Sequence, residues 1–355
     1  MRQLKLLLVG PYPPPYGGIA MTVFDIQQYL LAHRMCHVEV LDIGEGRATK
    51  NGETLRVTGP WDFIHQVMSF ARKGYLIHLE TNGHNFKSWI SALICSAAGC
   101  LNGRKTIIAF GSGNLPAYLL QLNRWMRVVV KAVLGSAGVV ICRNQNMVEA
   151  IQKVSEHHDR IEIVPGFMGL HTRKLIDVPQ NIKTFCDEHT PLIGATVTLE
   201  PEYGASLALQ AIQRLLPKHP RLGLVLLGIG PEDAKKLPEY AAMRSQVFPA
   251  GAVEANVALS IMRQLGLFLR PTYFDGDSLS IREAIALGIP VVASNTGLRP
   301  TGVVLFEPGQ IDDLEKQLSY ALHHREEITA NQCNASETGG GVDKMMQIYR
   351  RLSNQ

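Results

Sequence analysis

The chain has 355 residues, of which 46% are hydrophobic and 19% are charged, with a formal net charge of +4 and a pI near 8.7. This length exceeds what one hydrophobic core usually fills, so we expect two domains. The composition excludes a disordered chain. The mild basic charge suits an anionic substrate or membrane surface but is too small to indicate nucleic-acid binding.

Along the whole chain, short apolar strands alternate with helical patterns. The first series of strands is Leu4–Val9, Val38–Leu41, Leu76–Leu79, Thr106–Phe110, Val139–Cys142 and Ile161–Val164. After a polar stretch from Val178 to Thr190, the second series is Leu192–Val197, Leu222–Leu227, Val247–Pro249, Leu267–Arg270, Val291–Ala293 and Val303–Phe306. Continuous rather than alternating apolar strands indicate parallel sheets covered on both faces. The predicted fold class is therefore α/β, with two doubly wound Rossmann-like domains and ligands at the carboxyl ends of the strands.

Cysteines and hydropathy give an expected location. The six cysteines are Cys36, Cys95, Cys100, Cys142, Cys186 and Cys333, and no two form a Cys-x-x-Cys pair. We expect reduced thiols in a reducing compartment. The first apolar run is too short for a signal peptide, and no run approaches the roughly 20 residues of a transmembrane helix. These patterns predict a cytoplasmic protein.

The first strand leads into the dipeptide Gly17-Gly18, which follows the prolines at 13–15 and precedes a helix starting near Ala20. Glycines there let backbone amides approach a phosphate or a sugar ring closely. An ordinary strand-to-helix turn is the alternative, and the dipeptide alone favours it.

A helical pattern from Tyr118 to Leu134 combines Arg124, Trp125, Arg127 and Lys131 with many apolar residues. A basic helix that carries an aromatic residue suits an anionic membrane surface. A core helix with its basic side chains on the solvated side is the commoner arrangement, and we favour it.

The turn Gly228-Ile229-Gly230-Pro231 ends a strand of the second series. It is not a dinucleotide fingerprint, because Asp233 stands in the place of the third glycine. We predict a tight turn near a nucleotide.

The segment from Phe274 to Glu283 is the most informative. Asp275 and Glu283 stand eight residues apart across a turn between a strand and a helix that ends at Gly288. The free amides of a helix start form an anion site, and the two carboxylates suit hydroxyl groups on either side of a phosphate, as in a ribose and a sugar. Alternatively, Ser280 to Glu283 is a capping box in which Glu283 only stabilises its own helix.

Asp275-Gly276-Asp277 resembles a metal-binding Asp-x-Asp motif, but a hard cation needs further oxygen ligands. Asp277 precedes Ser278 and Ser280, so a capping or turn role is equally reasonable. We predict no metal site.

Taken together, these motifs resemble those of a family 4 glycosyltransferase of the GT-B fold, which is retaining and uses a nucleotide sugar. The match runs from Asp275 through Glu283 and Gly288-Ile289-Pro290 to Val304–Gly309, and it reappears in Pro11–Ala20. The resemblance implies two Rossmann-like domains facing across a cleft. Residues 1–170 would form the acceptor-side domain and residues 171–335 the nucleotide-sugar-binding domain. Residues 336–355 would form a helix that crosses back to the first.

The resemblance also implies roles for individual residues. Glu283 would hold the ribose hydroxyls and Asp275 a hydroxyl of the donor sugar. The loop of Gly17 and Gly18 would lie over the donor. The backbone amides that would bind the sugar or the diphosphate belong to Asp277, Ser278, Leu279 and Ser280.

The sequence departs from the family pattern in its cations and in one histidine. Many relatives carry an Arg and, five residues later, a Lys at the first junction of the second domain, where Thr198 and Tyr203 stand here. We hypothesise that Arg270 and Arg299 supply the missing phosphate charges. Arg282 is a weaker candidate, because it points about 100° away from Glu283 on the helix.

Relatives often carry a histidine after the strand Thr106–Phe110, where this chain has Gly111. His84 lies in another loop of the first domain. It suits a substrate hydroxyl, although a solvated loop histidine is favoured.

The predicted function is a retaining glycosyltransferase of the hexosyltransferase type, acting on a hydroxyl acceptor such as a glycan or a lipid-linked precursor of a surface polysaccharide. Its donor is a nucleotide-diphosphate sugar, with no further cofactor. Catalytic roles fall to Asp275, Glu283 and Arg270, and Thr198 and Arg299 belong to the donor site. A peripheral contact with the inner face of the membrane stays open. The alternatives are a non-catalytic protein with a degenerate donor site and a nucleotide-sugar epimerase.

Overall fold

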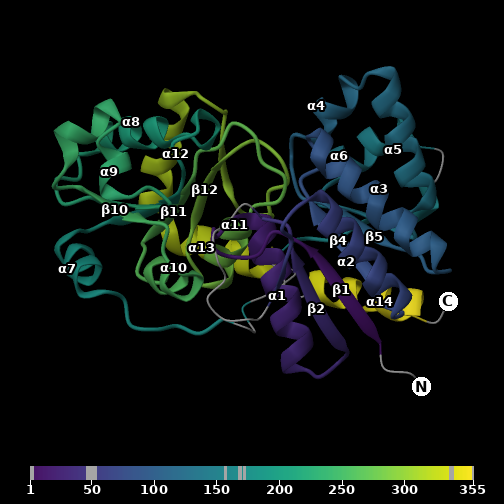
Figure 1. The fold of residues 1–355 in the computed structure, drawn as a ribbon. Coiled ribbons are helices and arrows are strands. Elements are labelled where there is room, and N and C mark those ends of the chain that lie inside the picture. Colours follow the sequence, from purple (N-terminus) through teal and green to yellow (C-terminus); the bar gives the residue numbers. More distant parts are fainter. Residues whose placement is uncertain are drawn as a thin grey trace. The chain divides into compact units, whose positions relative to one another are not determined.

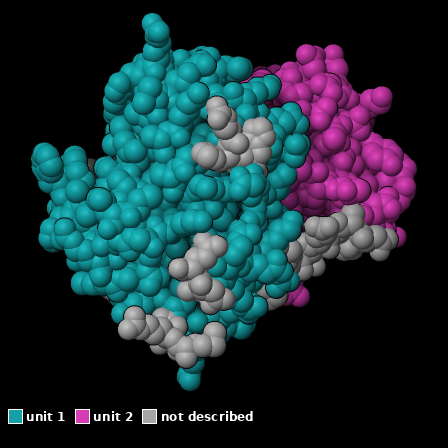
Figure 2. All heavy atoms as spheres, turned by 90° about the vertical axis from the view of Figure 1, so that its right-hand side faces the viewer, with its two compact units in different colours: residues 1–172, 339–355 teal, residues 173–338 magenta. Residues whose placement is uncertain are grey.

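The computed structural model describes residues 4–44, 54–155, 158–166, 170, 173–335 and 340–353. The chain forms two compact units, one of residues 1–172 with 339–355 and the other of residues 173–338 (Figures 1 and 2). Each unit is built on one parallel sheet with apolar layers on both faces. The predicted α/β class with two doubly wound sheets is therefore confirmed.

The first unit contains a seven-stranded sheet in the order β3-β2-β1-β4-β5-β6-β7. Its strands are β1 (Lys5–Gly10), β2 (His37–Asp42), β3 (Leu55–Arg56), β4 (Leu76–Thr81), β5 (Ile107–Phe110), β6 (Val139–Cys142) and β7 (Ile161–Ile163). β3 was not predicted, because it has only two residues and both are exposed. The other six were predicted from their apolar runs, since the central strands are buried along nearly their whole length.

The helices of this unit are α1 (Gly18–Ala32), α2 (Pro60–Arg72), α3 (Phe86–Leu101), α4 (Leu115–Leu120), α5 (Arg124–Ser136), α6 (Gln145–Gln152) and α14 (Gly340–Ser353). The single helix expected from Tyr118 to Leu134 is wrong, because the chain forms α4 and α5 instead. Asn123 separates them, and its side chain accepts a hydrogen bond of 2.8 Å from the amide of Met126, which caps α5.

The last helix, α14, is anchored to the first unit through a buried polar network. The hydroxyl of Tyr349 lies 2.7 Å from Nδ1 of His78 on β4, and Nε2 of His78 lies 3.3 Å from Glu80. Glu80 accepts a 2.5 Å hydrogen bond from Arg143, which also donates to the carbonyl of Val164. Burial raises the pKa of Glu80, but Arg143 and His78 outweigh it and leave that pKa at about 2. The carboxylate therefore stays ionised although it is fully buried.

The second unit contains a six-stranded sheet in the order β10-β9-β8-β11-β12-β13. Its strands are β8 (Leu192–Thr196), β9 (Gly223–Leu227), β10 (Val247–Gly251), β11 (Leu267–Arg270), β12 (Val291–Ser294) and β13 (Val304–Phe306). Its helices are α7 (Gln180–Glu188), α8 (Ala205–Leu215), α9 (Pro231–Ala234), α10 (Ala255–Met262), α11 (Leu279–Ala286), α12 (Ile311–His323) and α13 (Arg325–Ala335). α7 lies in the stretch that was expected to be only a polar connection, and it buries Ile182 and Phe185.

No helix within the ranges that the structure describes is long and apolar enough to cross a membrane.

Candidate functional site

The candidate site lies at the point where the strand order of the second sheet reverses. β8 and β11 are neighbours, with Ile193 paired to Leu267, although the chain continues from them in opposite directions along the sheet. The loops that leave the carboxyl ends of two such strands diverge and leave a crevice for ligands. The two loops are joined here by a hydrogen bond of 2.8 Å from the amide of Tyr273 to the carbonyl of Glu202.

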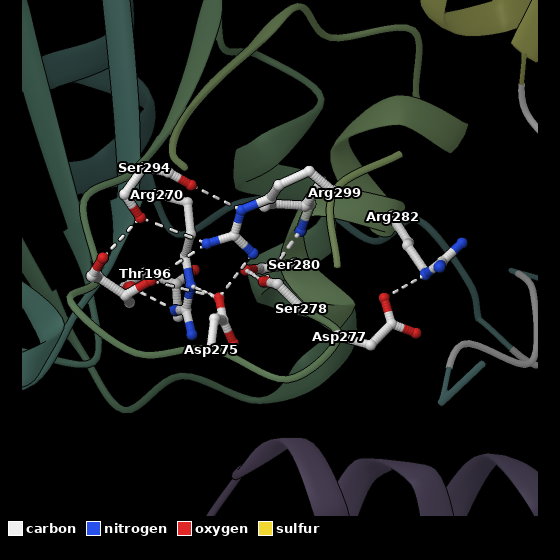
Figure 3. A network of polar contacts seen from close by, with 11 residues as sticks. Thr196, Arg270, Asp275, Asp277, Ser278, Ser280, Arg282, Ser294 and Arg299 are labelled. Carbon is white, nitrogen blue, oxygen red and sulfur yellow. Dashed lines mark hydrogen bonds and ion pairs between the residues drawn. The ribbon is translucent and has the colours of Figure 1, made fainter. Parts of the chain in front are cut away.

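Asp275 is the centre of this site. Its Oδ2 accepts hydrogen bonds from Nε of Arg270 at 3.1 Å, Nη1 of Arg299 at 3.0 Å and Oγ1 of Thr272 at 3.3 Å (Figure 3). Its Oδ1 makes no hydrogen bond with any residue that the structure describes. The carboxylate is therefore held in one orientation, with one oxygen left to accept from a ligand.

Asp275 is ionised in this environment. Burial raises its pKa, but the charges and hydrogen bonds of Arg270 and Arg299 outweigh burial and hold the pKa below its usual range. Burial lowers the pKa of Arg299, which nevertheless remains a cation because the ordinary pKa of an arginine lies far above neutral pH. Two guanidinium groups and one carboxylate leave this cluster with one net positive charge.

The two arginines differ in how many of their guanidinium nitrogens donate hydrogen bonds. Arg299 donates through all three nitrogens: its Nε donates to the carbonyl of Ser294 at 2.9 Å, and its Nη2 reaches the hydroxyls of Ser294 and Thr272. Arg270 donates through Nη1 to the carbonyl of Thr196 at 2.9 Å, and its guanidinium lies 5.5 Å from the ring centre of Tyr203. Nη2 of Arg270 has no partner among the described residues, so it retains donors for a ligand.

Helix α11 begins beside this cluster. Ser278 is its N-cap, and the hydroxyl of Ser278 accepts from the amide of Ile281 at 3.5 Å. The capping-box alternative is wrong, because the helix begins two residues before the expected cap at Ser280 and Glu283 lies beyond its first turn. Glu283 instead lies 3.6 Å from Arg173.

Asp277 lies apart from Asp275 in this arrangement. Its carboxylate accepts a 2.6 Å hydrogen bond from Nε of Arg282, on the other side of the turn in Figure 3. The two acidic side chains of the Asp-x-Asp triplet thus have different arginine partners. In the part of the chain that the structure describes, no group of three His, Cys, Asp or Glu residues is arranged to hold a metal ion.

Two contacts of the site were missed by sequence reasoning. Arg173 has a side chain only 3% exposed and pairs with Glu283 from more than a hundred residues away. Tyr203, which was noted only because it replaces a cation, lies against the guanidinium of Arg270. Arg173 lies outside the motifs, and the place of Tyr203 in the family pattern indicates a lost cation rather than a contact with Arg270, so neither contact was predictable.

Thr198 lies just after β8, at the position where the family pattern led us to expect a cation. Its hydroxyl oxygen is buried, and its interaction with the carboxylate of Glu200 lowers the pKa of that carboxyl. Thr198 therefore contributes a polar group, but no charge, to the end of β8.

The loop after β8 also borders a cavity of about 540 Å³. Leu199, Leu237, Tyr273 and Phe274 form apolar parts of its wall, and Glu200 and Glu202 add negative charge. No basic residue lines it among those described, so the cavity does not suit a phosphate. A phosphate would be favoured on the side of Arg270.

In the first unit, Gly17 and Gly18 start helix α1. A Cβ added to either glycine would meet no atom within 4 Å, so the packing of the described residues does not require glycine there. The absence of side chains leaves the backbone of this loop accessible.

In the loop after β5, Gly111 stands in the place of the expected histidine. A Cβ at Gly111 would lie 2.8 Å from the side chain of Ile19, so a larger residue would require Ile19 to shift. His84 reaches this loop from the end of β4, and its Nδ1 lies 2.7 Å from the hydroxyl of Ser112. We favoured a solvated loop position for His84, but this side chain also makes a specific contact with Ser112.

Comparison with known proteins identifies the family of the second unit. Residues 190–324 match the family model described as glycosyl transferases group 1. The chain is 29% identical over 157 residues to protein CapJ of Staphylococcus aureus, which covers 41% of this chain and 39% of CapJ. It is also 29% identical over 135 residues to the sulfoquinovosyl transferase of Arabidopsis thaliana, covering 35% of this chain and 26% of that protein. The chain thus matches well under half the length of these relatives.

The fold of the whole chain is also found in solved structures. HepE of Anabaena in complex with UDP superposes with a TM-score of 0.70 at 17% identity, covering 99% of this chain and all of HepE. Sucrose-phosphate synthase of Thermosynechococcus elongatus gives a TM-score of 0.74 at 18% identity, covering 99% of this chain and 100% of that one. At these identities the likeness establishes the fold. Residues 190–324 belong to the glycosyl transferases group 1 family, as the motifs indicated, and the chain that carries them has the GT-B fold.

Proposed function

We propose that this protein is a retaining glycosyltransferase that moves a sugar from a nucleotide-diphosphate sugar to a hydroxyl acceptor. The observation that carries the proposal is the ionised carboxylate of Asp275, which two arginines hold beside the start of α11. Fixed acceptors and donors beside a helix start suit a ligand that carries both hydroxyls and phosphates.

The two carboxylates have separate roles in this proposal. The free Oδ1 of Asp275 accepts a hydrogen bond from a hydroxyl of the donor sugar, and Glu283 binds the ribose hydroxyls. The backbone amides from Asp277 to Ser280 donate to the sugar or the diphosphate, since amides at a helix start lack intrahelical partners.

Arg270 supplies the main phosphate cation in place of the missing Arg and Lys. It has an unused Nη2, and its guanidinium is supported by Tyr203, the residue that replaces the lysine. A cation–π contact of this kind restrains an arginine without neutralising it. Arg299 contributes charge, but its principal task is to orient Asp275, because all of its nitrogens are engaged. The hydroxyl of Thr198 accepts or donates at the same phosphate group.

UDP-sugars are the first donors to test, because HepE, which shares the fold, was solved with UDP and with UDP-glucose. The acceptor in this proposal is a glycan or a lipid-linked glycan, as in the assembly of a surface polysaccharide.

Gly17 and Gly18 contribute an accessible backbone to donor binding. The reaction takes place in the cytoplasm, without a metal ion.

The direct test is turnover of a panel of UDP, GDP, ADP, CMP and dTDP sugars, with and without mixed glycan acceptors. We expect release of the nucleotide from one donor and a product that keeps the anomeric configuration of that donor. Glu283→Gln should reduce turnover at least about tenfold, because a charged hydrogen-bond partner is lost. The exposed Glu254, at the start of α10, provides the matched control Glu254→Gln, which should have no effect.

Two outcomes would contradict the proposal. Conversion of the donor sugar into an epimer without any acceptor would identify an epimerase. Failure to bind or turn over any donor would identify a non-catalytic protein with a degenerate site.

A further inference from the structure

The first unit contains a long stretch without any acidic residue. No Asp or Glu occurs between Glu80 and Glu149, although the chain as a whole contains 31 of them. The same stretch contains seven basic residues, Lys87, Arg104, Lys105, Arg124, Arg127, Lys131 and Arg143. Arg143 is buried with Glu80, and the other six are exposed. This stretch of the chain therefore exposes a strong positive charge, although the net charge of the whole chain is small.

Large apolar side chains are exposed within the same stretch. Trp125 is 57% exposed, Val128 67% and Phe86 49%, and Leu120 at the end of α4 is 79% exposed. The rings of Phe86 and Trp125 stack with centroids 5.7 Å apart, which joins the start of α3 to the start of α5. A core helix explains the buried face of α5 but not the exposure of Trp125 and Val128 on its other face.

Helix α5 combines both properties on one face. Its buried side consists of Met126, Val129, Val130, Val133 and Leu134. Its exposed side carries Arg124, Arg127 and Lys131 at helical spacing, with Trp125 and Val128 between them. None of these three cations forms an ion pair with another residue in the described ranges. They are therefore available to an external anion.

We propose that this exposed face of α5, together with Phe86, binds the surface of an anionic lipid bilayer. Cations with intervening Trp and aliphatic side chains match an interface where phosphate head groups lie above acyl chains. The long side chains of Arg and Lys reach the head groups while Trp125, Phe86 and Val128 enter the boundary. The inference is independent of the proposed transfer reaction, and it concerns a different unit from the Asp275 cluster.

Tryptophan fluorescence and vesicle sedimentation test this inference on the full chain. Of the three tryptophans, Trp89 is fully buried and Trp61 is 84% exposed on α2, so Trp61→Phe leaves Trp125 as the only exposed one. Phosphatidylcholine vesicles that contain phosphatidylglycerol should shift the emission of this variant to the blue. Phosphatidylcholine vesicles alone should not, and high salt should weaken the effect.

Charge reversal with a matched control tests the cations. Arg124→Glu, Arg127→Glu and Lys131→Glu together should lower partitioning onto the anionic vesicles by about a hundredfold. Lys183→Glu, Lys218→Glu and Arg263→Glu reverse three exposed cations of the second unit and change the net charge equally. This control should bind as well as the natural sequence. Trp125→Ala should also weaken binding, while Trp61→Ala should not.

Several results would overturn the proposal. One is a natural chain that does not sediment with anionic vesicles. Another is binding that the control triple reversal removes to the same degree, or binding without a change in Trp125 emission. Retention of the protein by polyglutamate but not by vesicles would assign the face to an acidic protein partner instead.

Discussion

Arg270 and Arg299 contact the same oxygen of Asp275, yet they differ in what remains of their hydrogen-bonding capacity. Arg299 uses its three nitrogens on Asp275, Thr272 and Ser294, whereas Arg270 has one nitrogen without a described partner. The chemistry of a donor site depends on such spare groups more than on the number of cations nearby. Substitutions at the two positions should therefore have different effects.

Arg270→Gln should weaken the binding of UDP by about tenfold to a hundredfold, because a charge-assisted hydrogen bond contributes roughly 1.5–3 kcal/mol. Binding of uridine, which has no phosphate, should change little.

Arg299→Gln should instead lower the free energy of unfolding by about 1–3 kcal/mol, since it leaves buried polar groups without a partner. Calorimetric titration and urea unfolding of both variants measure these effects. An Arg270 variant that binds UDP like the natural protein would disprove its role.

The lowered pKa of Asp275 predicts how stability depends on pH. A carboxyl whose pKa is lowered on folding stabilises the protein fully above its unfolded value of 3.8, and this contribution is lost as pH falls through the lower folded value. Asp275→Asn should therefore destabilise the second unit at pH 7, and the difference from the natural protein should shrink below pH 3.8. Urea unfolding at pH 7 and pH 3 measures the difference. An equal difference at both pH values would contradict this interpretation.

For single residues, the sequence predicted which carboxylates and arginines lie at the candidate site but not how they are paired. Asp275, Arg270 and Arg299 were chosen because they flank one motif, and they do form one cluster. The cation–π contact of Tyr203 and the partner of Glu283 depend on side-chain positions of residues far apart in the chain. No periodicity or spacing encodes such contacts.

At the start of α1, the fold itself does not require the two glycines, so their presence there points to a functional role. Gly17 and Gly18 have free space where a Cβ would stand. Gly297 has a φ of 66° and would bring a Cβ within 2.2 Å of the carbonyl oxygen of Asp275. Glycine is thus required by the fold at Gly297 alone among these three.

Gly17→Ala and Gly18→Ala should therefore leave thermal stability unchanged or raise it by up to about 1 kcal/mol. Each should still reduce sugar transfer about tenfold or more, because a methyl group would displace a ligand that lies on the backbone. Gly297→Ala is the matched control and should lower stability. Melting temperatures and turnover of the three variants provide the test. Full transfer by both of the first two variants would remove this loop from the donor site.

Elements were predictable where an apolar run is continuous and long. β6 and β11 have the bounds that their apolar runs predicted, since all four residues of each are buried. α7 was not predicted, because its two buried residues are surrounded by polar ones. α4 and α5 were predicted as one helix, because the break at Asn123 lies inside an otherwise apolar pattern. Breaks set by a cap are harder to detect than breaks set by proline or glycine.

Across the whole molecule, the two sheets share one feature of their strand order. In each, the strand order reverses once, between β1 and β4 in the first unit and between β8 and β11 in the second. The loops with Gly17 and His84 follow the first pair, and those with Thr198 and Asp275 follow the second. The repeated strand–helix rhythm made both sheets predictable, whereas their strand orders had to come from the structure.

We propose above all that the start of α11 and the Asp275 cluster bind a nucleotide-diphosphate sugar. The first experiment is therefore to measure thermal stabilisation by UDP, GDP, ADP, CMP, dTDP and their sugar conjugates. A ligand at a hundred times its Kd stabilises the folded state by about 2.7 kcal/mol, which is a shift of several degrees. We predict such a shift with one nucleotide, its loss in Glu283→Ala and its retention in Glu254→Ala. No shift with any nucleotide, or a shift that Glu283→Ala leaves intact, would show that this cluster does not bind the donor.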